Sequence, residues 1–458
     1  MTESLRRSHK PLTKRQQRRK HFVSGTVLAL FGFTAFRVVT GNRDPEMNIV
    51  WPTPPEHNSF AAYVAASHGI TLHSKGFDEA YDAVIGRRDI SQKPLPVSLA
   101  QFVAENHSSL EILRQEGFTH PFQVPPSTGL MEDTEYLSDF RSMARLLVIE
   151  GDVRAKQGNL RGAIDSNLDA VRLGEDISRN GTLVHYNTSI ACQRIGQRGL
   201  WRQLKQYSAD DARYAVRRLE ELSLRQQTLS ESLEGEKRYG QTTLRTFFTT
   251  FFTSPDTSAE TNSEGKAKTR PDAFTYWLNH KRSPFYAVWS KQSIWDNYTS
   301  YFDSQIRRSR ERYDPRATET PIPSDMFSQL LVPVIQSSNF KAASFTAERG
   351  LLTTALAVQA YQREHNGKPP TSLAELTPGY LTATPADPFA ALPNTPLRYR
   401  REGTENQFVL YSVGPNGKDD GGKRIDNRRF LKDLAPGEKR ADFVLAGSDG
   451  DIIAGLNF

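Results

Sequence analysis

The stretch that decides the fold of this chain runs from Asn339 to Pro370 and reads NFKAASFTAERGLLTTALAVQAYQREHNGKPP. Its apolar side chains recur at helical spacing on one face, namely Phe345, Leu352, Ala355, Leu356 and Ala360. Asn366-Gly367 and the prolines at 369 and 370 then end the helical pattern. The stretch therefore predicts one long amphipathic helix.

Short alternating segments follow this helix. LRYRR, Leu397–Arg401, and FVLYSV, Phe408–Val413, alternate like two paired strands joined by a turn around Gly403. DFVLA, Asp442–Ala446, is a candidate third strand. Before them, SLAEL predicts a short helical turn, and the loop PADPF offers Phe389 as a plug for the edge of a core. We expect a long helix packed on a small antiparallel sheet.

The order of these pieces resembles a known family. Residues 338–446 resemble the globular part of the major, G-type pseudopilin of bacterial type II secretion. The matching pieces are ALAVQAYQREHNGKPPTSLAEL, PADPF followed by PLRYR, and FVLYSVGPNGKDDGG. The resemblance covers about a quarter of the chain and implies a pseudopilin-like α+β domain, which we place at 336–458.

The resemblance also implies a calcium site. In that family the acidic loop after the second strand binds calcium, which here points to Asp419 and Asp420 with backbone carbonyls of Ser412–Gly417. Calcium binds hard oxygen ligands, and the glycines of the loop let the backbone curl around an ion. Asn-Gly and Asp-Gly also form turns without any metal. A Lys- and Arg-rich insertion, 423–440, departs from the short loop of the family.

The start of the chain departs from that family as well. Pseudopilins open their membrane helix with Gly-Phe-Thr and a following Glu, and that helix continues into the globular domain. Here Gly32-Phe33-Thr34 lies inside an apolar segment without such a Glu, some 300 residues before the related domain. We therefore expect a pseudopilin-like module instead of a pilus subunit, with an atypical secretion pseudopilin as an alternative.

Charge and hydropathy near the N-terminus predict a membrane anchor. Residues 1–21 hold eight Lys and Arg against one acidic residue, which accounts for the whole net formal charge of +7. The apolar segment 22–40 follows and predicts a single transmembrane helix in a bacterial cell membrane, with the basic tail in the cytoplasm. A cleaved signal peptide is the rival, but no small-residue cleavage site follows. The formally neutral remainder disfavours a nucleic-acid partner.

The region from 41 to 335 reads as a stalk and a helical body. Residues 41–60 are Pro-rich and predict an extended stalk, and 61–335 predict a helical extracytoplasmic domain with a flexible loop at 253–272. Within it, Tyr136–Ile177 predicts a helical hairpin turning at residues 157–159 and weakly resembles one tetratricopeptide unit. We expect the aromatic residues between 276 and 302 to form the buried face of helices, followed by a solvated basic segment.

No sequence motif points to catalysis. The single cysteine, Cys192, excludes an internal disulfide and predicts a buried helix residue. His68 and His73 are the closest histidine pair, at a spacing that does not share a helix face, and no nucleophile elbow or phosphate-binding loop is present. Asp449 and Asp451, in GSDGD, read as a solvated turn.

We therefore expect a protein that is mostly α with a C-terminal α+β domain and is not an enzyme. Its expected role is protein interaction or scaffolding at the bacterial envelope, with secretion or pilus-like components as candidate partners. An envelope hydrolase with a site assembled from distant positions in the helical domain is the alternative from a different class.

Overall fold

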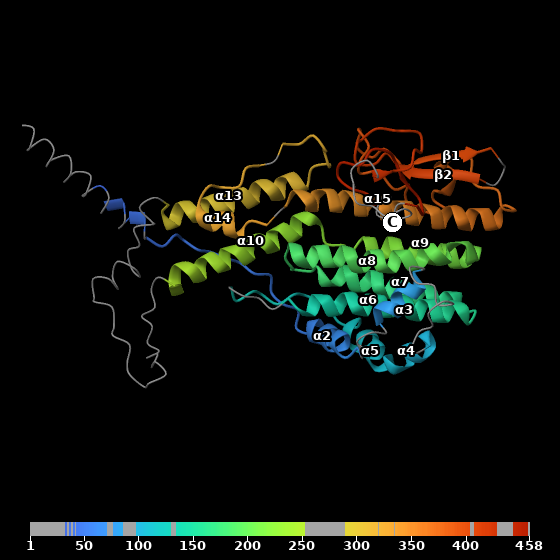
Figure 1. The fold of residues 1–458 in the computed structure, drawn as a ribbon, viewed down its shortest axis with the longest axis horizontal. Helices are drawn as coiled ribbons and strands as arrows, with labels where there is room; N and C mark the ends of the chain where they lie inside the picture. Colours follow the sequence, from blue (N-terminus) through green and yellow to red (C-terminus); the bar gives the residue numbers. More distant parts are fainter. Residues whose placement is uncertain are drawn as a thin grey trace, which may run out of the picture. The chain divides into compact units, whose positions relative to one another are not determined.

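The computed structural model describes residues 43–70, 77–85, 98–129, 134–251, 289–318, 320–333, 335–403, 407–427 and 443–456, with 33, 36, 37, 40 and 41. Over these ranges the chain is mostly helical, with a small antiparallel sheet near the C-terminus, which confirms the predicted fold class at this level (Figure 1). The contacts form two compact units. The larger unit comprises Val50–Gly240, Tyr301–Pro321 and Val332–Phe458, and the smaller unit comprises Met1–Ile49, Gln241–Ser300 and Ile322–Leu331.

The predicted helical hairpin is confirmed. Helix α6 spans Tyr136–Lys156 and α7 spans Leu160–Ile177. Between them Gly158 adopts a φ of +82°, a conformation that costs glycine little, and the Asn159 side chain accepts a hydrogen bond from the backbone N–H of Gly162. Gly158 therefore ends α6 and Asn159 begins α7, as the sequence indicates.

A second hairpin packs on the first. Helix α8 spans Leu183–Gln203, a 3-10 turn follows at Leu204–Gln206, and α9 spans Ala209–Ser223. The Ser208 hydroxyl caps α9 by accepting from the N–H of Asp211. Helix α8 lies against α6 and α7, and α9 lies against α7. Equivalent helices of the two hairpins are thus neighbours.

Short helices cover the other side of α6. They are α2, Phe60–His68; α3, Phe77–Val84; α4, Leu99–Glu105; and α5, His107–Ile112, which continues into a π-helical turn at Leu113–Gly117. Helices α2, α3 and α4 contact α6 directly, and α5 packs on α2. Tyr63 anchors this layer, because its buried hydroxyl donates to Asp176 at 2.8 Å.

The segment predicted as a stalk, 41–60, has no helix or strand between residues 43 and 59. Part of it is bound to the larger unit. Asn58 exchanges hydrogen bonds with the backbone of Gln123, at 2.7 and 3.0 Å, and the Gln123 side chain donates to the carbonyl of Pro52. Residues 52–59 therefore run along the protein and lead into α2.

Helix α15, Gln336–Glu364, lies between helices and sheet (Figure 1). It packs against α8 and α9 and also against β2 and β3. The five predicted core residues are buried, and Leu351, Ala357 and Val358 are buried with them. The sequence pattern identified only one buried face, whereas the surrounding elements bury more of the helix. Asn366 and Gly367, both with positive φ, end the segment as predicted.

The sheet has three antiparallel strands in the order β1, β2, β3. Strand β1 is Arg398–Glu402 and β2 is Gln407–Ser412, close to the predicted pair. The third strand is β3, Ile452–Ile453, paired as Tyr411 with Ile453 and Ser412 with Ile452. The predicted third strand at 442–446 is wrong, because residues 443–446 form no strand and two later isoleucines fill that place in the sheet. The predicted turn SLAEL is a 3-10 turn at Leu373–Leu376, and Phe389 is buried as expected.

The remaining helices are α10, Leu229–Thr246, continued by a π-helical turn at Phe247–Phe251; α13, Lys291–Ser309; and α14, Met326–Leu331. The aromatic side chains of α13 are buried, as predicted, at Trp295, Tyr298, Tyr301 and Phe302. The predicted flexible loop 253–272 lies outside the described residues.

The predicted transmembrane segment 22–40 lies mostly outside the described residues. Over the ranges that the structure covers, no helix combines the length and the hydropathy needed to cross a bilayer.

Candidate functional site

The acidic loop after β2 is held at its start by a buried carboxylate. Asp387 accepts hydrogen bonds from the Ser412 hydroxyl at 2.7 Å and from the N–H groups of Val413 and Phe389 at 2.8 and 3.0 Å. Burial raises the pKa of Asp387 in spite of these donors. Next, Gly414 has a φ of +72° and lies so close to the Gly450 carbonyl that a side chain would collide with it. The loop therefore leaves β2 in one fixed direction.

A second buried carboxylate, from the C-terminal tail, closes the same loop. Asp451 is fully buried and accepts from the N–H groups of Gly422 at 2.7 Å, Lys423 at 3.1 Å and Asp420 at 3.3 Å. The predicted solvated turn is thus wrong for Asp451, although Asp449 is exposed. The physical reason is that β3 pairs with β2. This pairing places Asp451, the residue just before β3, against the loop. The Ile-Ile pair after Asp451 was the sequence signal.

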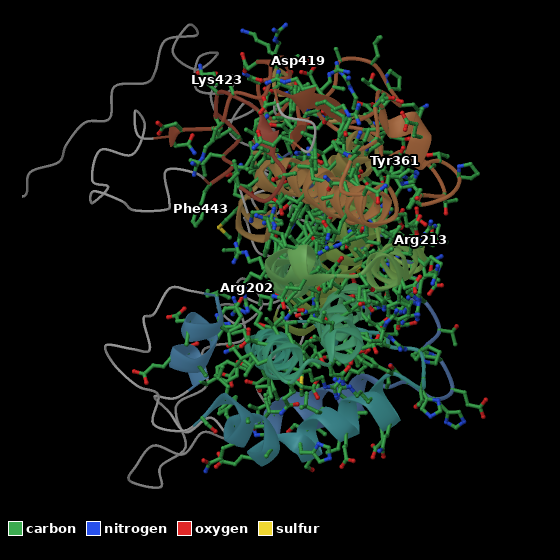
Figure 2. The ribbon with its side chains drawn as sticks, turned by 90° about the vertical axis from the view of Figure 1, so that its right-hand side faces the viewer. Arg202, Arg213, Tyr361, Asp419, Lys423 and Phe443 are labelled. Carbon is green, nitrogen blue, oxygen red and sulfur yellow. The ribbon has the colours of Figure 1, made fainter. Side chains whose placement is uncertain are left out.

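The two predicted calcium ligands have protein partners. Asp419 accepts from the Tyr411 hydroxyl at 2.9 Å and from the N–H of Gly421 at 3.1 Å, and it forms an ion pair with Arg398 at 3.0 Å. Partial burial pushes the pKa of Asp419 up, but these donors outweigh it and the pKa is lowered. Asp420 accepts from the Asn416 side chain at 2.8 Å. In Figure 2 Asp419 lies in the sheet layer, away from Arg213 of α9.

In this arrangement an arginine neutralises part of the negative charge of the loop. Calcium needs six to eight oxygen ligands, and Arg398 is paired with one of the two carboxylate oxygens of Asp419. Among the backbone carbonyls of Ser412–Gly417, the Gly414 carbonyl accepts a hydrogen bond from the N–H of Gly417. In the part of the chain that the structure describes, no group of three or more His, Cys, Asp or Glu could hold a metal ion.

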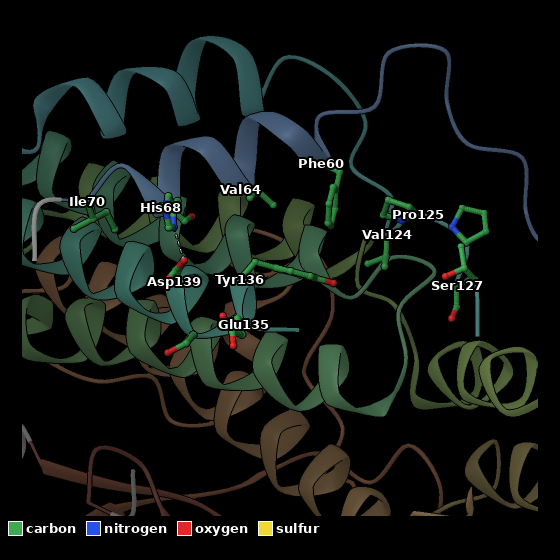
Figure 3. Close-up of a pocket in the computed structure, with 14 residues that line it drawn as sticks. Phe60, Val64, His68, Ile70, Val124, Pro125, Ser127, Glu135, Tyr136 and Asp139 are labelled. Atoms are coloured by element: carbon green, nitrogen blue, oxygen red, sulfur yellow. Dashed lines mark hydrogen bonds and ion pairs between the residues drawn. The ribbon is translucent and has the colours of Figure 1, made fainter. Parts of the chain in front are cut away.

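An open groove of about 960 Å³ lies elsewhere on the larger unit, between α2, the segment 124–128 and the start of α6 (Figure 3). Its apolar lining consists of Phe60, Val64, Ile70, Val124, Pro125, Pro126 and Tyr136. Its polar lining consists of Ser67, His68, Ser127, Thr128, Glu135, Ser138 and Asp139. In Figure 3 Phe60 and Val64 of α2 lie beside Tyr136 of α6, and the Phe60 and Tyr136 rings meet edge to face at 5.2 Å.

Local contacts hold the walls of the groove in place. The N–H of Val124 donates to the Arg179 carbonyl at 3.0 Å, and the Asn180 side chain donates to the Val124 carbonyl at 3.2 Å. His68 lies 3.3 Å from Asp139, which links α2 to α6. The Ser67 hydroxyl is buried and has no hydrogen-bond partner among the described residues.

Tyr136 of the groove is backed by a buried histidine. The Nδ1 atom of His185 accepts from the N–H of Thr182 at 3.1 Å, so its Nε2 carries the proton and donates to the Tyr136 hydroxyl at 2.6 Å. Burial lowers the pKa of His185 to about 4, so the ring is neutral near pH 7. The pair therefore positions Tyr136 and does not make it more nucleophilic.

The sequence did not predict the groove, because its lining comes from three separate segments. Only His68 among its residues was considered, as part of a histidine pair whose other member, His73, lies outside the described residues. Cys192 is buried as predicted, and burial raises the pKa of its thiol to about 12. No protein-family model matches this chain, and no curated protein or solved structure is significantly similar to it.

Proposed function

We propose that this protein is a single-pass envelope protein that binds a partner polypeptide through its extracytoplasmic body. The basic tail 1–21 and the apolar segment 22–40 support an anchor with the N-terminus in the cytoplasm. The two stacked hairpins, in which α6 lies against α8 and α7 against α9, support a tetratricopeptide-like body. Such bodies present extended surfaces that suit binding and scaffolding.

The groove is the observation that carries this proposal. Its volume of about 960 Å³ is at the upper end for small-ligand sites, about 300–1,000 Å³, and it is open along the surface. Apolar side chains would bury those of a bound segment. Hydroxyls such as Ser127 and Ser138 would bond the N–H and C=O groups that an extended peptide must satisfy.

The C-terminal part supports a link to secretion or pilus-like envelope components. Helix α15 ends at Glu364, just before Asn366-Gly367, and packs on an antiparallel sheet, as the pseudopilin resemblance implies. Calcium binding at Asp419 and Asp420 stays a prediction of that resemblance. Equal melting temperatures of the purified protein in calcium and in chelator would remove it.

The interaction role is tested by co-purification from native membranes with mild crosslinking and mass spectrometry. Val64→Glu places a charge in the groove, and Val184→Glu is the matched control, because Val184 is exposed on α8 outside the groove. We expect a reproducible partner with the wild-type protein and Val184→Glu, and its loss with Val64→Glu. The same proteins recovered with both variants would contradict the proposal.

A further inference from the structure

A second cavity, of about 280 Å³, lies on the larger unit where α8 meets α15 and the segment 443–445. Helix α8 contributes four side chains at positions i, i+3, i+4 and i+7, which share one helical face: Arg194, Gln197, Arg198 and Trp201. Phe443 lies on the same side of the larger unit as Arg202, which is one helical turn after Arg198 on α8 (Figure 2). The cavity therefore has a rigid helical floor.

Of the two arginines that line the cavity, one lacks an acidic partner within the described ranges. Arg194 makes a two-pronged ion pair with Glu348 of α15, at 2.6 and 2.8 Å, so its charge is neutralised. Arg198, one helical turn further along, is half-buried and has no hydrogen bond or ion pair with any residue that the structure describes. Its planar guanidinium is suited to a carboxylate, which it can bind with two parallel hydrogen bonds.

Beside Arg198 in the sequence lies a buried amide whose nitrogen has no hydrogen-bond partner among the described residues. Gln197 is only 3% exposed, and its Nε2 makes no hydrogen bond within the described ranges. Leaving a buried amide nitrogen unpaired is costly, so such groups call for a specific explanation. An amide can donate to a carbonyl and accept from an N–H, which is the pair of groups that a peptide unit presents.

The remaining wall is apolar and fixed in place. Phe443 and Leu445 are 37% and 41% exposed. The Asn427 side chain donates to the Phe443 carbonyl at 2.5 Å, and the N–H of Leu445 donates to the Ser448 hydroxyl at 2.9 Å. Trp201 lines the same cavity, so these residues together offer an apolar surface to a side chain.

We propose that this cavity binds the C-terminal end of a partner polypeptide. The terminal carboxylate pairs with Arg198, the last peptide unit bonds the Gln197 amide, and an apolar last side chain packs between Trp201 and Phe443. A chain end combines these three groups within one residue, which matches the small volume of the cavity. The choice of a peptide as the carrier of the carboxylate rests on the proposed interaction role. The cavity itself is separate from the groove.

The test measures binding of a fluorescent, N-acylated tetrapeptide, Ala-Ala-Leu-Phe, with a free C-terminal carboxylate, to the full-length protein. The same peptide with a C-terminal amide is the first comparison. We expect the free acid to bind roughly 10- to 100-fold more tightly than the amide, as for the loss of a charged hydrogen bond. Equal binding of the two peptides, or no binding at millimolar concentration, would overturn the proposal.

Two arginine variants localise the effect. Arg198→Gln should abolish the preference for the free acid, whereas Arg217→Gln, which removes an exposed arginine of α9 without a described partner, should keep it. Equal melting temperatures of both variants and the wild type show that folding is intact. If 3-phenylpropionate binds as tightly as the peptide, the site takes small carboxylates and the peptide proposal fails. A negative result in the peptide experiment would leave the Val64→Glu comparison for the groove unaffected. The two proposals can therefore be rejected independently.

Discussion

Single carboxylates determine the shape of the C-terminal loop. Asp387 and Asp451 are buried hydrogen-bond acceptors that fix its two ends. Asp419 accepts a hydrogen bond from Tyr411 and forms an ion pair with Arg398. Ionised acceptors form stronger hydrogen bonds than neutral ones, and a buried N–H that loses its acceptor is destabilising. The loop is therefore ordered by the protein's own donors and acceptors.

Asp451→Asn tests this at the residue scale. The amide keeps the size of the side chain but turns an NH₂ group toward N–H donors, so we expect a loss of roughly 1.5–3 kcal/mol in the free energy of unfolding. Asp449→Asn, two residues earlier and exposed, is the matched control and should change little. Urea unfolding of both variants measures the difference. Equal stability of the two variants would show that Asp451 does not hold the loop.

At the scale of elements, local signals were readable from the sequence and distant pairings were not. Asn159 begins α7, and Asn366-Gly367 ends α15, because caps and breaks act within one helical turn. Strand β3 consists of two isoleucines paired with a strand some 40 residues earlier, and two residues are too few to show an alternating pattern. The groove was missed for the same reason, since α2, the segment 124–128 and α6 meet only in the folded chain.

The start of α8 makes a prediction about pH. Thr182 and His185 form a reciprocal cap there, and burial lowers the pKa of His185 to about 4. In the unfolded chain the imidazole has its ordinary pKa of about 6.5 and binds a proton more readily. The contribution of His185 is therefore fully present above pH 6.5 and is lost as the pH falls toward 4, by up to about 3 kcal/mol.

His185→Gln keeps a capping side chain and removes the titration. Unfolding free energies measured at pH 7 and pH 4.5 should differ less in this variant than in the wild type. An unchanged difference would mean that other groups cause the acid sensitivity.

At the scale of the larger unit, one continuous apolar core runs from α7, α8 and α9 through α15 into the sheet. Arg194 with Glu348, and Arg213 with Glu364, tie α8 and α9 to α15 by ion pairs at 2.6 Å. The sequence suggested separate bodies before and after residue 336, because the pseudopilin resemblance covers only the part of the chain after it. In the fold, α15 is buried by the helices on one side and by the sheet on the other, so the two regions share one core.

Leu356→Ala tests this coupling. Leu356 is fully buried in α15, and a buried Leu→Ala change costs about 2–5 kcal/mol. We expect helix content and sheet-region signals to melt together at a lower temperature. Leu224→Ala, which truncates a leucine that is 88% exposed, should have little effect. Separate melting of the sheet region in the Leu356→Ala variant would show that it is an independent domain.

We propose that the groove binds a partner polypeptide at the cell envelope. The most direct measurement is photo-crosslinking in living cells with a photoreactive phenylalanine analogue at Thr128, which lines the groove, and at Arg217, which is exposed elsewhere. We expect a discrete adduct of defined mass from position 128, absent from position 217 and lost when Val64→Glu is added. Identical adducts from both positions, or none from position 128, would contradict the claim.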